Sequence, residues 1–235
     1  METVTRVREC RLRRVNEAWS YEERFRREIE SNWQRRRAAN PSFFNGRIFL
    51  MARPSIRDGI LSAQMIETSF AAYLHWKDNG YPDKDIHDGF GSAIIRARGG
   101  EILLSSQNPG HVNTGTLCLP SGFIDRNDLT DDGRIDIAAS IVRELEEETG
   151  LPPTAFERRP EILVTQVGTS ISMAIEFRSS KTAPELRAEL LANLAKQSDP
   201  ELCDLVVISN ASDAQSNPDV AAYARLAVTA VFAGA

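Results

Sequence analysis

The stretch RELEEETGL, Arg143 to Leu151, decides the fold, because it places four glutamates within five residues of one predicted helix. They are Glu144, Glu146, Glu147 and Glu148. Like charges three or four residues apart on a helix destabilise it by about 0.2–0.5 kcal/mol per pair. A partner of opposite charge is therefore expected to hold this cluster in place.

The helix that carries the glutamates has recognisable ends. Asp136 is suited to the N-cap, and Gly150 is suited to the position just after the last turn. Between them Ile137, Ile141 and Leu145 recur every four residues, which predicts a buried apolar stripe. The acidic residues are therefore expected on another side of a helix that packs against the body of the protein.

The spacing of the acidic residues points to metal chemistry. Glu144, Glu147 and Glu148 stand at i, i+3 and i+4, so their carboxylates are expected to converge on one patch. Hard oxygen ligands of this kind suit Mg²⁺ or Mn²⁺, and Mg²⁺ commonly shares a phosphate oxygen of its substrate. We therefore expect these three glutamates to hold a divalent metal; a merely acidic, exposed helix is the alternative.

Composition limits the class of protein. The chain has 235 residues, of which 42% are hydrophobic and 26% are charged, so an ordinary globular protein with a sizeable core is expected. No apolar stretch approaches the roughly 18 residues that span a bilayer, and the start METVTRVREC has no apolar segment of signal-peptide type. Three scattered cysteines argue against a disulfide framework. We expect a soluble cytoplasmic protein, whose oligomeric state the sequence leaves open.

Positive charge is concentrated at the start of the chain. Residues 1–40 carry eleven arginines and seven glutamates, a net charge of +4, whereas the rest of the chain carries −9. A basic arm can bind nucleic acid, but here Glu and Arg interleave at helical spacings around Trp19, Phe25 and Trp33. Residues 1–40 are therefore predicted to form an N-terminal helical extension that packs its aromatic side chains on the main body. Nucleic acid is not the expected partner.

The rest of the chain, residues 41–235, mixes strands and helices without the regular alternation of a doubly wound sheet. A mixed sheet layered with helices is expected, in the α/β class and of α+β type. Two hairpins are predicted, around residues 98–100 and 168–169. The other predicted elements are a strand after residue 46, an extended segment at 60–70, a helix closed by Gly80, a strand at 116–120, helices at 183–196 and 219–233, and a strand at 202–210.

RELEEETGL resembles the second half of the Nudix box, whose pattern is G-x5-E-x7-R-E-U-x-E-E-x-G-U with U aliphatic. The resemblance implies a Nudix-type α/β/α sandwich and metal-dependent hydrolysis of a nucleoside diphosphate linked to another moiety. Carried over by position, it implies that Glu144, Glu147 and Glu148 bind metal and that Arg143 orients a glutamate, so these four are the implied catalytic residues. Glu146 falls at the variable position and is expected to face solvent.

The first half of the box does not match. Counting back from the arginine, its glycine and first glutamate positions hold Leu129 and Ile135. Ser121-Gly122 resembles the glycine pair that leads into the loop, so an insertion in the loop is expected. Asp125 and Asp136 are the candidates for the missing glutamate, although Asp136 serves equally as a helix cap. The number of metal ions therefore stays open.

The base that activates water is not assigned by the box. Glu147 and Glu148 are candidates within it. Glu201, which precedes the predicted strand at 202–210, is a candidate from elsewhere in the chain.

The substrate class is suggested by a second, looser resemblance. NPSFFNGRIFLM at 40–51 and ETSFAAYLHW at 67–76 are similar to the segment ahead of the Nudix domain in a group related to UDP-sugar pyrophosphatases. Within these segments Phe43, Phe44 and Trp76 either stack on a base or sugar or belong to the core.

The expected function is therefore a Mg²⁺- or Mn²⁺-dependent pyrophosphohydrolase. Its expected partner is a small-molecule nucleoside diphosphate derivative, above all a nucleoside diphosphate sugar, which it cleaves to two monophosphates. The alternative is a Nudix-fold nucleotide-binding or regulatory protein with weak or no catalysis. The intact glutamates favour the enzyme, and the unmatched first half of the box keeps the alternative open.

Overall fold

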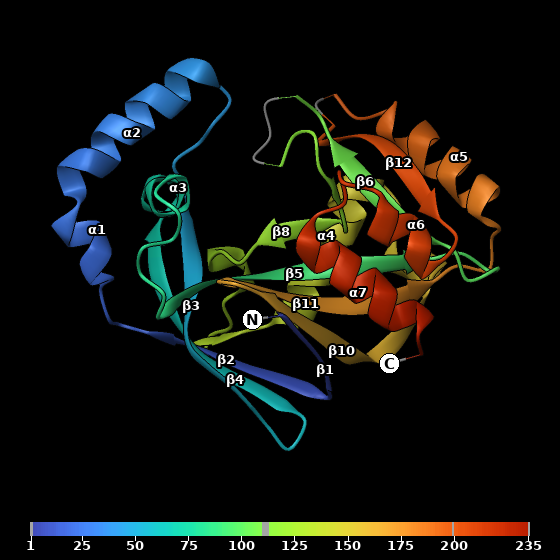
Figure 1. The fold of residues 1–235 in the computed structure, drawn as a ribbon, viewed down its shortest axis with the longest axis horizontal. Coiled ribbons are helices and arrows are strands. Elements are labelled where there is room, and N and C mark those ends of the chain that lie inside the picture. Colours follow the sequence, from blue (N-terminus) through green and yellow to red (C-terminus); the bar gives the residue numbers. More distant parts are fainter. Residues whose placement is uncertain (1, 110–112, 199, 235) are drawn as a thin grey trace.

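The computed structural model describes residues 2–109, 113–198 and 200–234 (Figure 1). In these ranges the elements follow in this order: β1 (Glu2–Val7), β2 (Glu9–Val15), α1 (Ser20–Arg24), α2 (Arg26–Ala39), β3 (Arg47–Arg57), β4 (Ile60–Ser69), α3 (Phe70–Asp78), β5 (Ile86–Arg96), β6 (Ile102–Gln107), β7 (Leu117–Cys118), β8 (Ser121–Phe123), η1 (Arg126–Asp128), β9 (Arg134–Ile135), α4 (Ile137–Thr149), η2 (Pro153–Ala155), β10 (Glu157–Val167), β11 (Ser170–Arg178), α5 (Ala183–Leu194), β12 (Leu202–Ile208), α6 (Ala211–Ser216) and α7 (Ala222–Phe232).

One mixed sheet runs through the molecule, and β5 lies at its centre. Its main path has the order β1-β10-β11-β5-β3-β4-β2-β9, and β6, β7, β8 and β12 branch from it. The start of β5 pairs with β3 through Ile86 and His87, and its end pairs with β6 through Ile95 and Arg96. β8 pairs with the middle of β5, and β11 runs parallel to β5. β5 therefore connects the two halves of the molecule.

Helices cover both faces of the sheet around β11. Ile171, Met173, Ile175 and Phe177 of β11 belong to the core cluster that contains the apolar side chains of α4 and α5. Ala174, between them, belongs to the cluster formed by α6 and α7. This alternation is the period of two that a strand imposes on its side chains. Figure 1 shows α7 crossing in front of β10 and β11. The α/β/α layering predicted from the sequence is confirmed.

The helices α1, α2 and α3 form a separate layer over β3 and β4, at the left of Figure 1. Trp19 and Trp33 are buried there, and Phe25 packs against the same cluster. The predicted packing of these aromatic side chains on the main body is therefore confirmed. Trp76 of α3 is fully buried in this cluster, so it is a core residue.

The helical prediction for residues 1–40 is wrong for its first part. Residues 2–7 and 9–15 are strands: β1 pairs with β10, and β2 pairs in parallel with β4. The β-branched residues of this segment favour a strand, and burial of Val7 and Leu12 in the core outweighs the helical spacing of the arginines. Helix begins only at Ser20. The division of the chain at residue 40 into an extension and a domain stays a proposal.

Most of the other elements lie where the sequence predicts them. The predicted strand at 116–120 is reduced to the two residues of β7, and the short helix α6 was not predicted. None of the helices in the described ranges is both long enough and apolar enough to cross a membrane.

Candidate active site

The helix α4 is built as its sequence predicts. The Asp136 carboxylate caps it by accepting a hydrogen bond of 3.0 Å from a backbone N–H of the first turn. Gly150 ends it in the left-handed conformation, with a φ of 67°. Ile137, Ile141 and Leu145 are buried between the helix and the sheet. Both ends of the helix and its buried face are therefore confirmed.

Two glycines let α4 lie close against the sheet. Gly91 of β5 and Gly122 of β8 are partners across the two strands. A Cβ atom at Gly91 would lie 2.6 Å from Cγ1 of Ile141, and one at Gly122 would lie 2.2 Å from Cδ of Glu144. Both distances are well below a van der Waals contact, so a larger residue at either position would displace the Ile141 or the Glu144 side chain. The Glu144 carboxylate consequently lies directly over the backbone of β8.

The four glutamates of α4 have different environments. The Glu148 side chain is buried, and the Glu144 side chain is only 15% exposed. The Glu147 side chain is 59% exposed. Glu146 is exposed, as expected for the variable position. The structure therefore places Glu144 and Glu148 against the body of the protein and leaves Glu147 at the surface.

Burial perturbs the two inner carboxyls. Desolvation raises the pKa of Glu148 well above its ordinary value, and the negative charges of Glu201 and Glu144 raise it further. Desolvation likewise raises the pKa of Glu144 to about 7, against the attraction of Arg143. Oε2 of Glu148 is buried and has no hydrogen-bond partner among the described residues. Without a further cation, this part of the site therefore favours the protonated, neutral forms of the two carboxyls.

Arg143 is held by three carboxylates. Its guanidinium lies 3.0 Å from Asp128, 2.7 Å from Glu144 and 3.2 Å from Glu147. Asp128 is buried, and its other oxygen accepts the backbone N–H of Asp125 at 2.9 Å. The loop before α4 thus fixes the arginine, and the arginine in turn contacts two glutamates of the helix.

Asp128 is the residue that the sequence reasoning missed. The two candidates for the missing glutamate have other contacts: Asp125 caps η1 by accepting the Asn127 N–H at 2.7 Å, and Asp136 caps α4. Asp128 lies fifteen residues before Arg143, so the fold of the loop, and not the spacing, brings the two together. The available signal was the pair of acids in DRND, which is typical of a capped turn.

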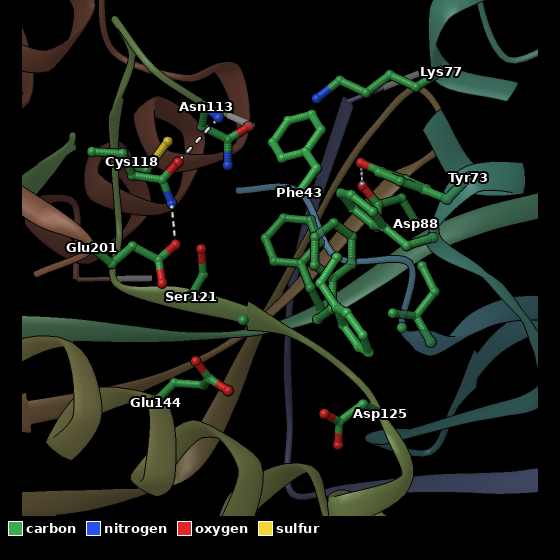
Figure 2. Close-up of a pocket in the computed structure, with 18 of the residues that line it drawn as sticks. Phe43, Tyr73, Lys77, Asp88, Asn113, Cys118, Ser121, Asp125, Glu144 and Glu201 are labelled. Carbon is green, nitrogen blue, oxygen red and sulfur yellow. Dashed lines mark hydrogen bonds between the residues drawn. The ribbon is translucent and has the colours of Figure 1, made fainter. Parts of the chain in front are cut away.

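Glu201 reaches the same region from the other end of the chain. Gln107 donates a hydrogen bond from Nε2 to Oε1 of Glu201 at 2.9 Å. Oε1 of Gln107 accepts the backbone N–H of Asn113 at 3.0 Å, which orients the amide so that its NH₂ group faces Glu201. Figure 2 shows Glu201 beside Ser121 and Glu144 below them, and the charges of both glutamates act on Glu148. The distal candidate predicted from the sequence therefore lies near Glu144.

A cleft of about 1220 Å³ opens beside these carboxylates. Glu144 and Glu201 lie on one wall, and Tyr73, Lys77 and Asp88 lie on the other (Figure 2). Phe44 is 81% exposed and lines the cleft. The other aromatic residues of the lining are Phe43, Phe70, Tyr81, Phe90, Phe123 and Tyr223. Of the three aromatic residues singled out in the sequence, Phe43 and Phe44 therefore line the cleft and Trp76 does not.

The residues present suit a divalent cation in their chemistry, although the complete ligand group expected from the sequence is not assembled. In the described part of the chain, no three His, Cys, Asp or Glu side chains are grouped as a metal site. Glu147 is instead engaged by Arg143. Carboxylate oxygens are the ligands that Mg²⁺ and Mn²⁺ prefer, and the unpartnered buried oxygen of Glu148 beside Glu144 fits a cation held by these two residues.

One protein-family model matches the chain. The model for the NUDIX domain matches residues 85–204, just over half of the sequence, from the start of β5 into β12. The match therefore includes Gly122, the whole of α4, and Glu201. No curated protein matches the chain.

Several solved structures are similar to the chain at low sequence identity. RenU, a Nudix hydrolase from M. smegmatis, is 17% identical, with a TM-score of 0.40 over 60% of this chain and 81% of its own. A bifunctional NMN adenylyltransferase/ADP ribose pyrophosphatase from Francisella tularensis, complexed with AMP and a manganese ion, is 20% identical, with a TM-score of 0.42 over 70% of this chain and 49% of its own. A C. elegans Ap4A hydrolase is 17% identical, with a TM-score of 0.39 over 62% of this chain and 95% of its own.

Proposed function

The chain belongs to the Nudix hydrolase family, and from that premise we propose that it is a metal-dependent pyrophosphohydrolase that cleaves a nucleoside diphosphate sugar to two monophosphates. The observation that carries the proposal is the large cleft with Glu144 and Glu201 on one wall. Buried Glu148, one turn further along α4, adds a third carboxyl to the same region.

Glu144 and Glu148 are the proposed metal ligands; Glu144, like Glu147, is paired with Arg143, but it lies inside the cleft lining, whereas Glu147 is at the surface. When bound, Mg²⁺ or Mn²⁺ supplies positive charge for the phosphates and for the attacking water. Desolvation and the neighbouring Glu201 disfavour the ionised form of Glu148, so without a metal this carboxyl favours its protonated form. A divalent ion inverts that preference, because it is then the largest charge nearby.

Glu201 is the proposed general base. Among the three candidates named from the sequence, only Glu201 lines the cleft, whereas Glu148 is buried and Glu147 is paired with Arg143. Gln107 holds its carboxylate in a defined orientation. Glu201 accepts a proton from the water that attacks one phosphorus, the pyrophosphate P–O bond breaks, and the second monophosphate leaves.

The size and the lining of the cleft support a substrate with two large groups. Its volume of about 1220 Å³ exceeds the roughly 300–1,000 Å³ of ordinary small-molecule sites. The exposed ring of Phe44 offers a surface on which a nucleobase can stack. The polar wall formed by Tyr73, Lys77 and Asp88 is available to the second group.

A substrate panel tests the proposal. UDP-sugars, ADP-ribose, dinucleotides and nucleoside triphosphates are incubated with Mg²⁺ or Mn²⁺, and monophosphate products are measured. We expect a nucleoside diphosphate sugar to have the highest kcat/KM and cleavage to stop when the metal is chelated. Tight nucleotide binding without any cleavage would instead support a regulatory protein, and a preference for triphosphates would contradict the proposed substrate class.

A further inference from the structure

Three polar side chains stand together on the wall of the cleft opposite Glu144 and Glu201. Tyr73 and Lys77 are four residues apart on α3, so they share one face of that helix. The Tyr73 hydroxyl donates a hydrogen bond of 2.9 Å to Oδ2 of Asp88, which lies on β5. All three residues line the cleft, and Figure 2 shows Lys77 reaching over Phe43.

This arrangement costs the fold free energy. Asp88 is buried, and desolvation raises the pKa of its carboxyl to about 6 in spite of the Tyr73 hydrogen bond and the nearby Lys77 charge. Desolvation also lowers the pKa of Lys77, which attraction to Asp88 opposes. Within the described ranges, no hydrogen bond or ion pair engages the Lys77 ammonium, and Tyr73 is the one hydrogen-bond partner of the Asp88 carboxyl. The Lys77 ammonium can therefore still donate hydrogen bonds, and the Asp88 carboxyl can still accept them, on the side of the cleft.

The chemistry of this wall matches a ligand that both donates and accepts hydrogen bonds and carries no net charge. Lys77 would attract a phosphate and Asp88 would repel one, so the pair together gives no net preference for an anion. The hydroxyls of a sugar ring donate to a carboxylate and accept from an ammonium or a phenol. Aromatic rings beside the cluster, including Phe43 and Phe123, offer apolar surface for the ring carbons; the centroids of Tyr73 and Phe123 lie 5.0 Å apart.

We propose that Tyr73, Lys77 and Asp88 form a hydroxyl-binding subsite that holds the sugar ring of the ligand across the cleft from Glu144. The assignment deepens the proposed function, on which it rests, by naming the residues that select the second group of the substrate. The same chemistry recognises a hexose and a ribose. To decide which of the two sugars occupies the subsite, binding is measured for analogues in which hexose hydroxyls or ribose hydroxyls have been removed.

Equilibrium binding to the metal-free protein tests the subsite without turnover. The probes are UDP-glucose and ADP-ribose, the UDP-glucose analogues that each lack one hexose hydroxyl, and the analogues with deoxyribose. Dissociation constants come from calorimetry in a chelator. For at least one hydroxyl we expect wild-type affinity to fall about tenfold on its removal, because a hydrogen bond to a charged group is lost. The hydroxyl ratio is the dissociation constant of the deoxy analogue divided by that of the intact ligand. In Asp88→Asn this ratio should fall towards one, and in Lys77→Met it should fall by less.

Asp78→Asn is the matched control. Asp78 follows Lys77 on the same helix, but it does not line the cleft. Its carboxylate pairs with Arg36 instead. This variant removes a nearby negative charge and should keep the wild-type hydroxyl ratio. Thermal melting of each variant shows whether the fold is retained, and Lys77→Met, at a partly exposed position, serves if Asp88→Asn does not fold.

The outcomes separate this inference from the proposed function. Hydroxyl-dependent binding that Asp88→Asn abolishes, without metal-dependent cleavage, supports the subsite and contradicts the hydrolase. Cleavage of nucleoside diphosphate sugars by a protein whose hydroxyl ratios are the same in Asp88→Asn and Lys77→Met overturns the subsite and leaves the hydrolase standing. A wild-type protein that binds neither UDP-glucose nor ADP-ribose also overturns the subsite.

Discussion

The backbone of Gly122 lies directly beneath the carboxylate of Glu144, so close that a Cβ atom at position 122 would stand 2.2 Å from Cδ of the glutamate. β8 therefore sets the position of Glu144 by having no side chain there. Because Gly122 is paired with Gly91 across the strands, and Gly91 lies under Ile141, the same two strands position both the helix and its inner carboxylate.

The first prediction concerns this contact. Gly122→Ala should lower kcat/KM by at least tenfold, because the added methyl displaces the Glu144 carboxylate. In the Glu144→Ala background the same substitution should have little further effect, since the group it displaces is gone. Steady-state kinetics of the wild type, the two single variants and the double variant give the energetic coupling between positions 122 and 144. Additive losses in the double variant would show that Gly122→Ala acts through something other than Glu144.

The second prediction compares two glutamates of the same helix. Glu148→Gln should abolish metal-dependent turnover while melting at the wild-type temperature or above, because it replaces a desolvated ionisable carboxyl by a neutral amide of the same shape. Glu146→Gln, at an exposed position, is the matched control and should be nearly silent. Turnover and thermal melting are measured for both. A severe loss in Glu146→Gln, or near-normal turnover in Glu148→Gln, would contradict the assignment.

The third prediction concerns pH and metal removal. The unfolded chain ionises its glutamates near the ordinary value of 4.5, whereas Glu144 in the folded protein has a pKa of about 7, and the pKa of Glu148 is shifted in the same direction. Between these values the folded state binds more protons, so the stability of metal-free protein should fall as pH rises through this window. The melting temperature of the protein in a chelator, measured between about pH 4.5 and 7, tests this pH dependence of stability.

Metal and a variant provide the controls for that profile. Adding Mg²⁺ or Mn²⁺ should restore the stability that is lost at the upper end of the window, because the cation favours the ionised carboxyls. Glu144→Gln with Glu148→Gln should flatten the dependence. If the wild type and this double variant have the same pH profile of stability, burial does not raise the pKa of the two carboxyls.

The fourth prediction compares two aspartates: Asp136, which the sequence named, and Asp128, which it did not. Asp128→Ala should cost about 1–3 kcal/mol of stability, because it leaves Arg143 without its buried partner, and it should also lower activity. Asp136→Ala should cost about 1 kcal/mol through loss of the helix cap and leave kcat largely intact. Denaturant unfolding and kinetics on both proteins check this. Equal activity in the two variants would show that activity does not depend on the orientation of Arg143 by Asp128.

The fifth prediction concerns Gln107. Gln107→Glu places a second carboxylate against Glu201, where the amide now donates at 2.9 Å. Like charges disfavour ionisation, so the acid limb of the kcat/KM profile should move to higher pH. Gln107→Leu removes the donor without adding charge and should lower kcat with a smaller displacement of the limb. Identical profiles in wild type and Gln107→Glu would argue against Glu201 as the base.

Local signals in the sequence sufficed for α4. Its cap, its buried stripe and its terminal glycine lie within fifteen residues of one another, so each could be identified without knowing the fold. The exposure of Glu146 followed from the helix phase. The orientation of Glu147 did not follow, because it depends on Arg143, which also pairs with an aspartate outside the helix.

Features that depend on distant partners could not be predicted in this way. The β-branched residues of β1 are a local signal for a strand, but nothing within the first forty residues shows that it pairs with β10, where Val4 is opposite Thr165. The far wall of the cleft is similar: Tyr73 and Asp88 belong to a helix and a strand that only the fold brings together. Residues whose role is set by such pairing remain invisible to spacing and periodicity.

Glu144 and Glu148 are the residues that we propose to hold a divalent cation. The most direct measurement is a calorimetric titration of Mn²⁺ into the protein in the presence of UDP, with Glu144→Gln/Glu148→Gln in parallel. We expect saturable uptake by the wild type and at least tenfold weaker uptake by the double variant. Absence of uptake by the wild type, or the same affinity in both proteins, would contradict it.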